Sequence, residues 1–213
     1  MKKLFLFVFA ALSLNAMAQH VAPLNITIAD VKLDSLRQLY LQEPLLYRAA
    51  LDVVANQLSA NANELKDAKK ELKAEQGLAK EMDASLKNAT KVSANLKKLY
   101  EKEEKELKDM QKSIEGQQKT LSKQKELNAE LRSNFLVLLD GQMKDLGNSI
   151  RDIAQRKKSL TEFDAHVQGF QTNLQSYLQE IQDKTAKVAQ LEELLKERVS
   201  IVKAEQKAAK SMQ

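Results

Sequence analysis

The sequence predicts an all-α protein made of long heptad-repeat helices of the coiled-coil type, and three observations support this prediction. Apolar residues recur every seven positions along most of the chain. Only five Gly and two Pro occur in 213 residues, too few for the many turns of a compact domain of this length. The chain is also rich in Ala, Leu, Lys, Glu and Gln, the composition of long helices.

Residues 1–18 have the three parts of a secretory signal peptide. A basic start, Met1-Lys2-Lys3, is followed by an apolar run from Leu4 to Leu14, and Ala16-Met17-Ala18 provides the small-x-small cleavage pattern. The run is shorter than the roughly 20 apolar residues that cross a bilayer, although a membrane anchor at the N-terminus is the alternative interpretation. We therefore expect cleavage before Gln19, export to the bacterial periplasm, and no transmembrane segment in the mature chain.

Charge and cysteine content narrow the range of partners and chemistries. The chain has 34 Lys and Arg against 29 Asp and Glu. Removal of residues 1–18, which contain Lys2 and Lys3 and no acid, leaves 32 against 29, so the net charge falls from +5 to +3. The remaining charges alternate in sign, so nucleic acid is not an expected partner. The absence of Cys excludes disulfides, thiolate metal ligands and thiol nucleophiles.

Residues 19–50 are expected to form a lead-in segment followed by a short helix. Asn25–Ile28 alternates like a strand, but no partner strand is evident, so an extended segment is the better interpretation. Asp30 is a suitable N-cap for a helix that continues to Tyr40. Pro44 disfavours helix in the residue before it, so we expect a break there, with Pro44 beginning the next helix.

Residues 51–140 are predicted to form the first long coiled-coil helix. Apolar side chains there follow two series with a spacing of seven. The first series is Leu51, Leu58, Leu65, Leu72, Ala79, Leu86, Ser93, Tyr100, Leu107, Ile114, Leu121, Asn128 and Phe135. The companion series starts at Val54 and ends with Leu131 and Leu138. Together these are the a and d positions of a heptad.

A turn at residues 141–149 and a second coiled-coil helix at 150–210 complete the prediction. The second helix has its own series, Leu146, Ile153, Leu160, Val167, Leu174, Ile181, Val188, Leu195 and Val202, with Phe163, Phe170, Tyr177 and Leu191 in the companion positions. The two series are out of phase by four residues. A stutter in one continuous helix produces such a shift, and so does a turn. Gly141 and Gly147-Asn148-Ser149 favour the turn, and hence an antiparallel helical hairpin.

No catalytic, cofactor-binding or metal-binding residues are predicted. His20 and His166 are the only histidines, and neither has a second ligand at helical spacing. Polar residues interrupt the long series at Asn61, Glu75, Ser93, Glu103, Gln117, Gln124 and Asn128. Either they have a function, fixing the register of the coil or leaving it loose enough to open around a partner, or they are simply tolerated in a marginally stable coil. The second interpretation is the simpler one.

These features favour a non-enzymatic scaffold or adaptor of the cell envelope. We expect it to bind a protein partner through the coil, and the coil could also form a homo-oligomer. The signal peptide, lead-in and long Lys/Glu helices also resemble the general layout of the Skp/OmpH family of periplasmic chaperones. That resemblance implies a holdase for unfolded outer-membrane proteins with a small β-rich body. Only Asn25–Ile28 matches a strand of such a body, and the tail after Val202 supplies no closing strand. A coiled-coil regulator of cell-wall hydrolases is the third alternative.

Overall fold

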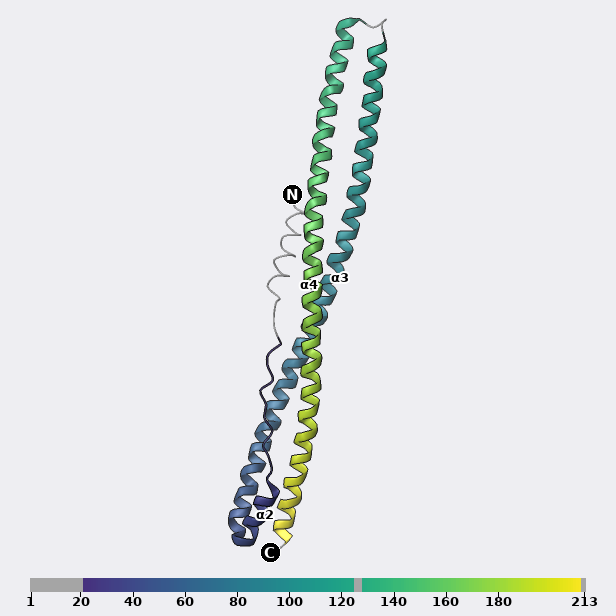
Figure 1. Ribbon diagram of the computed structural model, residues 1–213. Helices are drawn as coiled ribbons and strands as arrows, with labels where there is room; N and C mark the ends of the chain where they lie inside the picture. Colours follow the sequence, from purple (N-terminus) through teal and green to yellow (C-terminus); the bar gives the residue numbers. More distant parts are fainter. Residues whose placement is uncertain (1–20, 125–127, 212–213) are drawn as a thin grey trace. The chain divides into compact units, whose positions relative to one another are not determined.

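The computed structural model describes residues 21–124 and 128–211 (Figure 1). Three helices make up nearly all of this part: α2 (Leu33–Gln42), α3 (Pro44–Lys123) and α4 (Ala129–Ser211). The described residues contain no strand, and α3 and α4 pack against each other as a helical hairpin. The all-α helical hairpin is therefore confirmed. The expected signal peptide at 1–18 and its cleavage site before Gln19 lie outside the described residues.

The chain divides into two compact units. One, here called the turn unit, comprises residues 84–172 and contains the end of α3 and the start of α4. The other, here called the terminal unit, comprises the described residues 21–83 and 173–211, that is, the N-terminal segment, α2, the start of α3 and the end of α4.

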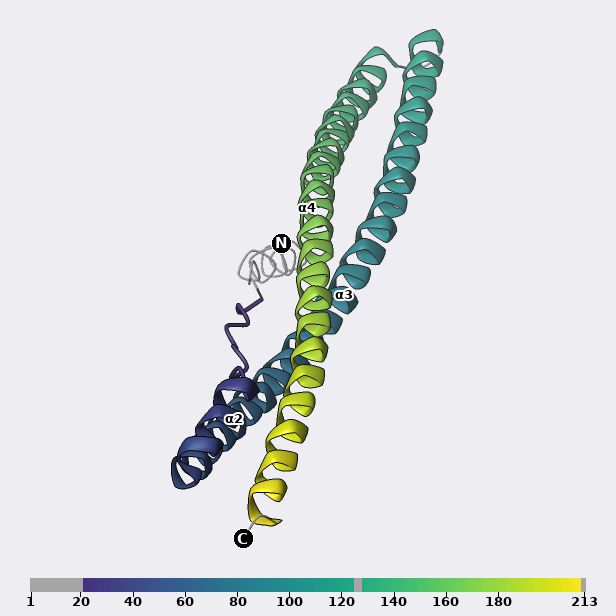
Figure 2. The same ribbon diagram turned by 60° about the horizontal axis from the view of Figure 1, so that its bottom comes forward.

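In the terminal unit, residues 21–32 are extended and lead into α2, which folds back on the start of α3 (Figures 1 and 2). The break between the two helices falls at Glu43, whose backbone angles of φ −144° and ψ 87° are not helical. Pro44 begins α3, as its lack of an N–H and its fixed φ predict. Tyr47 and Leu51 pack there with Ala209 of α4.

In the turn unit, the chain reverses between Lys123 and Ala129. The side chain of Asn128 accepts a hydrogen bond from the backbone N–H of Glu130 (3.0 Å), which caps the start of α4. The acidic side chain of Glu130 in the first turn also suits the positive end of the helix dipole. Ile114 of α3 then packs with Leu139 and Leu146 of α4.

The expected turn at residues 141–149 is therefore wrong, because this stretch lies inside α4. Gln118 donates a hydrogen bond to Asp140 across the hairpin (2.7 Å), so residue 140 already belongs to the returning helix. Gly141 has no positive φ and is accommodated as an ordinary helical residue at a cost of about 1 kcal/mol. The first long helix consequently ends at Lys123 rather than at residue 140, and the second begins at Ala129 rather than at 150.

The side chains buried along the two long helices largely follow the predicted seven-residue spacing. On α3 they are Leu51, Leu58, Leu65, Leu72, Ala79, Leu86 and Ser93, with Tyr47, Ala68, Met82 and Ile114. On α4 they are Leu139, Leu146, Ile153, Leu160, Val167, Leu174, Ile181, Val188, Leu195, Val202 and Ala209, with Phe170, Tyr177 and Lys184. The second series thus begins one heptad earlier than expected, at Leu139. The expected continuation of the first series at Phe135 and Leu138 is exposed.

Within the described residues, no helix has an apolar stretch long enough to cross a membrane.

Candidate functional site

The first turns of α4 carry more apolar residues than one partner helix can cover. Residues 135–139 read Phe-Leu-Val-Leu-Leu. Because each residue advances the helix by about 100°, five in succession pass all the way around it. Leu139 is buried against Ile114, whereas Val137 points away and is 69% exposed. A helix that is apolar on every side normally has partners on more than one side.

Leu131, Phe135 and Leu138 form a stripe on this part of α4 that we call the outer face. Their spacing of i, i+4 and i+7 places them on one side of the helix. They are 52%, 48% and 59% exposed, respectively. Further along the same side come the polar residues Gln142 and Asp145, so the apolar stripe is confined to the start of α4.

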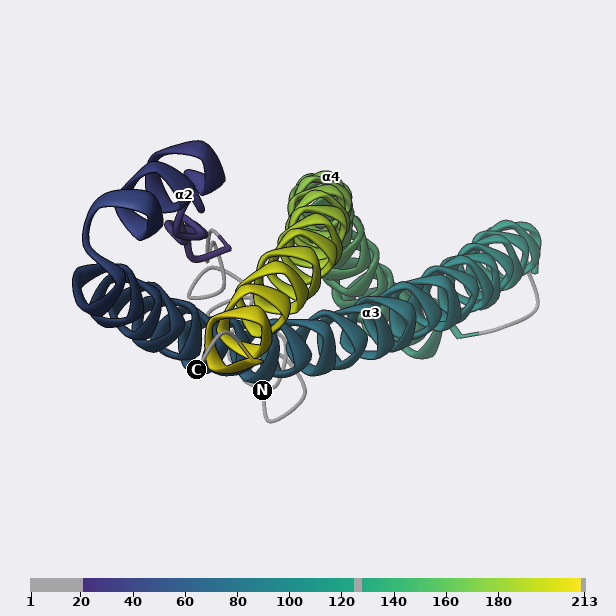
Figure 3. The same cartoon turned by 90° about the horizontal axis from the view of Figure 1, so that it is seen from below.

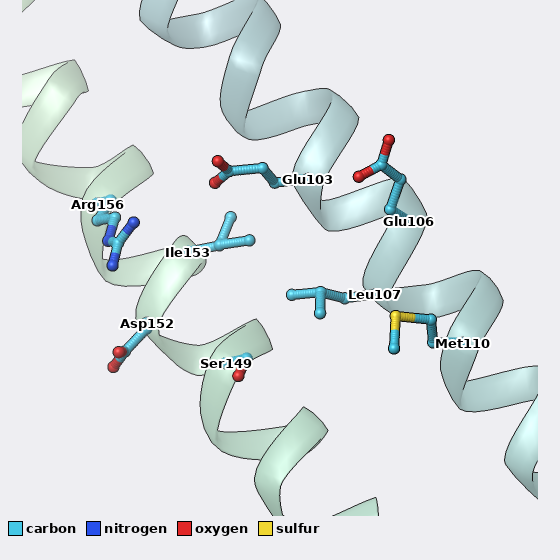
Figure 4. A pocket seen from close by; sticks show the side chains of 8 residues that line it. All are labelled: Glu103, Glu106, Leu107, Met110, Ser149, Asp152, Ile153 and Arg156. Atoms are coloured by element: carbon cyan, nitrogen blue, oxygen red, sulfur yellow. The ribbon is translucent and has the colours of Figure 1, made fainter.

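A shallow groove of about 280 Å³ lies further along the turn unit, between α3 and α4 (Figure 4). Leu107 and Ile153 face each other across it, and Met110 lies next to Leu107 on α3 (Figure 4). The remaining lining residues are polar: Glu103, Glu106, Ser149, Asp152 and Arg156. An apolar floor with three carboxylates and one guanidinium suits a side chain that is apolar along its stem and basic at its end.

Glu104, beside this groove, links the two helices electrostatically. Its carboxylate accepts a hydrogen bond from Lys108 on the same helix (2.6 Å) and another from Lys157 on α4. These two hydrogen bonds, that from Lys108 first, lower the pKa of Glu104 to about 2. The carboxylate is therefore charged under all ordinary conditions.

In the terminal unit, polar side chains of the long helices hold the backbone of the N-terminal segment 21–32. Asn61 accepts a hydrogen bond from the N–H of Ala29 (3.0 Å) and donates one to the carbonyl of Thr27 (3.2 Å). Lys187 donates to the carbonyl of Leu24 (3.2 Å). Ile28 and Val31 of the same segment are buried. The two long helices thus bind an extended chain by its backbone and by apolar side chains.

A buried ion pair lies under the beginning of the same segment. Lys184 of α4 contacts Glu75 of α3 at 2.9 Å, and Glu75 also accepts a hydrogen bond from the N–H of Ala22 (3.2 Å). Glu180 accepts another from the N–H of Val21 (3.0 Å). Burial raises the pKa of the neighbouring Tyr177, and the negative charges of Glu75 and Glu180 raise it further.

Asn61 and Glu75 were expected to fix register or to be merely tolerated, and the structure gives each a specific contact with the N-terminal segment. Lys184 was missed, although it follows Tyr177 by seven residues and so falls in the companion series of the second helix. The sequence does contain a signal for this ion pair. Lys184 is a basic residue at a position predicted to be buried, and Glu75 is an acidic residue at a corresponding position of the other helix.

The remaining polar positions of the long series have varied surroundings. Ser93 is buried and hydrogen-bonds Asp164, while Glu103 lines the groove. Asn128 caps α4 and so does not lie between the helices. His166 is exposed, and the described residues contain no group of three or more His, Cys, Asp or Glu arranged to hold a metal ion.

Comparison with protein families, with curated proteins and with solved structures gave no match for this chain.

Proposed function

We propose that the protein is an exported, non-enzymatic adaptor or scaffold of the bacterial cell envelope, which binds another protein through the outer face Leu131, Phe135 and Leu138. The observation that carries this proposal is the exposure of these three side chains at helical spacing. A stripe of apolar residues at i, i+4 and i+7 is the usual way in which one helix docks on another or in a groove. In such contacts a few side chains near the centre of the interface supply most of the binding free energy.

Export is the second part of the proposal and rests on residues 1–18. A basic start, a short apolar run and Ala16-Met17-Ala18 together form a signal that the export machinery recognises and signal peptidase removes. We expect the mature chain to begin at Gln19 in the periplasmic fraction. Mass spectrometry that finds Met1 retained in cytosolic protein would contradict this part.

Catalysis is not part of the proposal. Two helices packed side by side bury a line of side chains and enclose little volume, whereas enzyme sites are concave pockets that surround a substrate. The groove at Leu107 and Ile153 is shallow and open, and its lining includes neither His nor Cys.

A holdase chaperone is the second candidate, and one observation favours it. The helices of the terminal unit hold an extended chain through its backbone, by Asn61, and through the buried side chains Ile28 and Val31. An unfolded client offers the same groups. Against this candidate, the described residues at 25–28 form no strand, so the expected β-rich body lacks its first element.

Site-specific photo-crosslinking in cells tests the proposal. A photoreactive phenylalanine analogue replaces Phe135 in one strain and the exposed residue Gln155 of the same helix in a control strain. One dominant partner captured at position 135 and absent at 155 supports the adaptor. A broad set of non-native outer-membrane proteins supports the holdase instead. Equal capture at both positions, or none at position 135, contradicts binding by the outer face.

Loss of binding must be separated from loss of fold. We expect Leu138→Ser to abolish the crosslink from position 135 while changing the free energy of unfolding by no more than about 0.5 kcal/mol, because the side chain is exposed. Leu146→Ala, in contrast, removes a buried side chain and is expected to cost about 2–5 kcal/mol. A Leu138→Ser protein that unfolds as easily as Leu146→Ala would show that the outer face is part of the core.

A further inference from the structure

The two most exposed leucines among the described residues lie at the corner between α2 and α3 in the terminal unit. Leu41 in the last turn of α2 is 82% exposed, and Leu45 and Leu46 in the first turn of α3 are 80% and 51% exposed. We call these three residues the corner. The inner side of this end is occupied by Tyr47 and Leu51, which pack with Ala209 of α4.

The last turns of α4 bring exposed lysines to the same end of the unit. Arg48 donates a hydrogen bond to the carbonyl of Ala209 (2.9 Å), and Gln206 donates one to Asp52 (3.1 Å), so the end of α4 lies against the start of α3. Figure 3, which looks from this end, shows α2, the start of α3 and the end of α4 in the foreground, with the end of α4 to one side of the other two. Lys203, Lys207 and Lys210 are exposed in this part of α4.

The charge at this end is positive. Residues 37–53 and 203–211 contain five basic residues (Arg37, Arg48, Lys203, Lys207 and Lys210) and three acidic ones (Glu43, Asp52 and Glu205). Glu205 forms an ion pair with Arg37 (2.9 Å) and accepts a hydrogen bond from Tyr47 (2.7 Å), and these interactions, that with Tyr47 first, lower its pKa. None of the three lysines has a hydrogen-bond or ion-pair partner among the described residues.

We propose that this end of the terminal unit binds the surface of an anionic lipid bilayer. The corner leucines enter the boundary between head groups and acyl chains, and the three lysines contact the phosphates. Neither group is sufficient alone, since firm peripheral binding combines apolar insertion with attraction to anionic lipid. A second copy of the chain fits less well, because it would bring a second set of the same three lysines to a surface that is already positive.

This inference concerns the terminal unit and does not depend on the outer face of the turn unit. The bilayer is bound from one side only, which agrees with the absence of a membrane-spanning helix among the described residues. An adaptor with both surfaces would tether its protein partner to a membrane.

Sedimentation with lipid vesicles tests the inference. The chain is produced from Gln19 onward, because the apolar run Leu4–Leu14 would bind lipid by itself. We expect it to sediment with vesicles of equal parts phosphatidylglycerol and phosphatidylcholine and to remain in solution with pure phosphatidylcholine. Sedimentation with neither kind of vesicle would overturn the proposal.

Two variants and one control assign the binding to these residues. Two variants are each expected to weaken partition to anionic vesicles by about tenfold or more. The first combines Leu41→Ser with Leu45→Ser, and the second combines Lys203→Gln, Lys207→Gln and Lys210→Gln. Leu99→Ser with Leu178→Ser removes two leucines that are each 45% exposed elsewhere and is expected to leave partition unchanged. Circular dichroism confirms that all variants remain helical. Wild-type binding by either variant, or an equal loss in the control, would overturn the proposal.

Discussion

The ammonium group of Lys184 lies 2.9 Å from one carboxylate oxygen of Glu75 and 3.1 Å from the other, in the buried layer between α3 and α4. The side chain of Lys184 is 5% exposed and that of Glu75 is 16% exposed. Burying two charges is costly, and their attraction offsets this cost only while both are present.

Removing one member of this pair should therefore destabilise the protein. We expect Lys184→Met to lower the free energy of unfolding by about 2–3 kcal/mol, somewhat less than for a fully buried pair because Glu75 retains some solvent contact. Replacing both residues, Lys184→Met with Glu75→Leu, should recover most of this loss. Urea denaturation followed by circular dichroism measures both effects.

The matched control is Lys196→Met, which breaks the exposed pair with Glu193. Both side chains of that pair are at least 70% exposed, so the change should be within about 0.5 kcal/mol. Equal effects of Lys184→Met and Lys196→Met would contradict the buried pair.

The N-terminal segment supplies the second prediction. Asn61→Ala removes both the acceptor for Ala29 and the donor to Thr27, and is expected to cost about 1–2 kcal/mol and to speed hydrogen exchange at the Ala29 amide. Asn63→Ala, two residues along on an exposed position, should leave that exchange unchanged. Slow exchange at Ala29 in the Asn61→Ala protein would show that the segment is held by other means.

The acid titration of Glu104 is the third prediction. Because folding lowers the pKa of this carboxylate from 4.5 to about 2, the stability it contributes is present above pH 4.5 and is lost as the pH falls toward 2. NMR detection of the side-chain carboxyl carbon should show a midpoint near pH 2 in the wild type. Lys108→Gln removes the largest cause of the lowered pKa and should move the midpoint upward, toward its ordinary value. A wild-type midpoint near 4.5 would contradict the hydrogen bonds to Lys108 and Lys157.

The fourth prediction concerns the two glycines that the sequence placed in the turn. Gly141 and Gly147 lie in α4 without positive φ, and an added Cβ at either position meets nothing within 4 Å. Gly141→Ala and Gly147→Ala should each raise the stability by about 0.5–1 kcal/mol. Gly77→Ala, in the interior of α3, calibrates the gain expected for an ordinary helical position. In a turn that requires positive φ, Ala at position 141 or 147 would lower the stability instead.

The all-α hairpin could be predicted because the seven-residue periodicity and the composition extend over tens of residues. Misassigning one short stretch therefore does not change the predicted fold class. The position of the turn could not be predicted in the same way. The sequence signals for the actual turn are the N-cap residue Asn128 and the acidic residue Glu130 at the start of α4. The prediction instead relied on glycine as a turn signal and therefore placed the turn at 141–149. A long helix tolerates isolated glycines when its packing is favourable, and Leu139 and Leu146 provide such packing against Ile114.

The candidate sites were less accessible to sequence analysis. Phe135 and Leu138 continue the seven-residue spacing of the first helix and were therefore expected to be buried. Their exposure follows from the turn, which places them on α4, where Leu139 occupies the buried position. The contact between Asn61 and the N-terminal segment depends on residues more than thirty positions apart, and no short-range pattern specifies it.

The chain reverses its direction between Lys123, which ends α3, and Ala129, which begins α4. This reversal underlies both the core and the outer face, and one distance tests it. The protein has no native Cys, so Gln118→Cys with Asp140→Cys can carry two spin labels, with an excess of unlabelled protein to suppress distances between chains. Packed helices lie about 8–10 Å apart, so we expect the labels to be within about 20 Å of each other, consistent with the 2.7 Å hydrogen bond between the native side chains. If the chain instead continued as one helix past residue 140, the 22 residues from 118 to 140 would separate the labels by about 33 Å. A distance near that value would contradict the hairpin described for this protein.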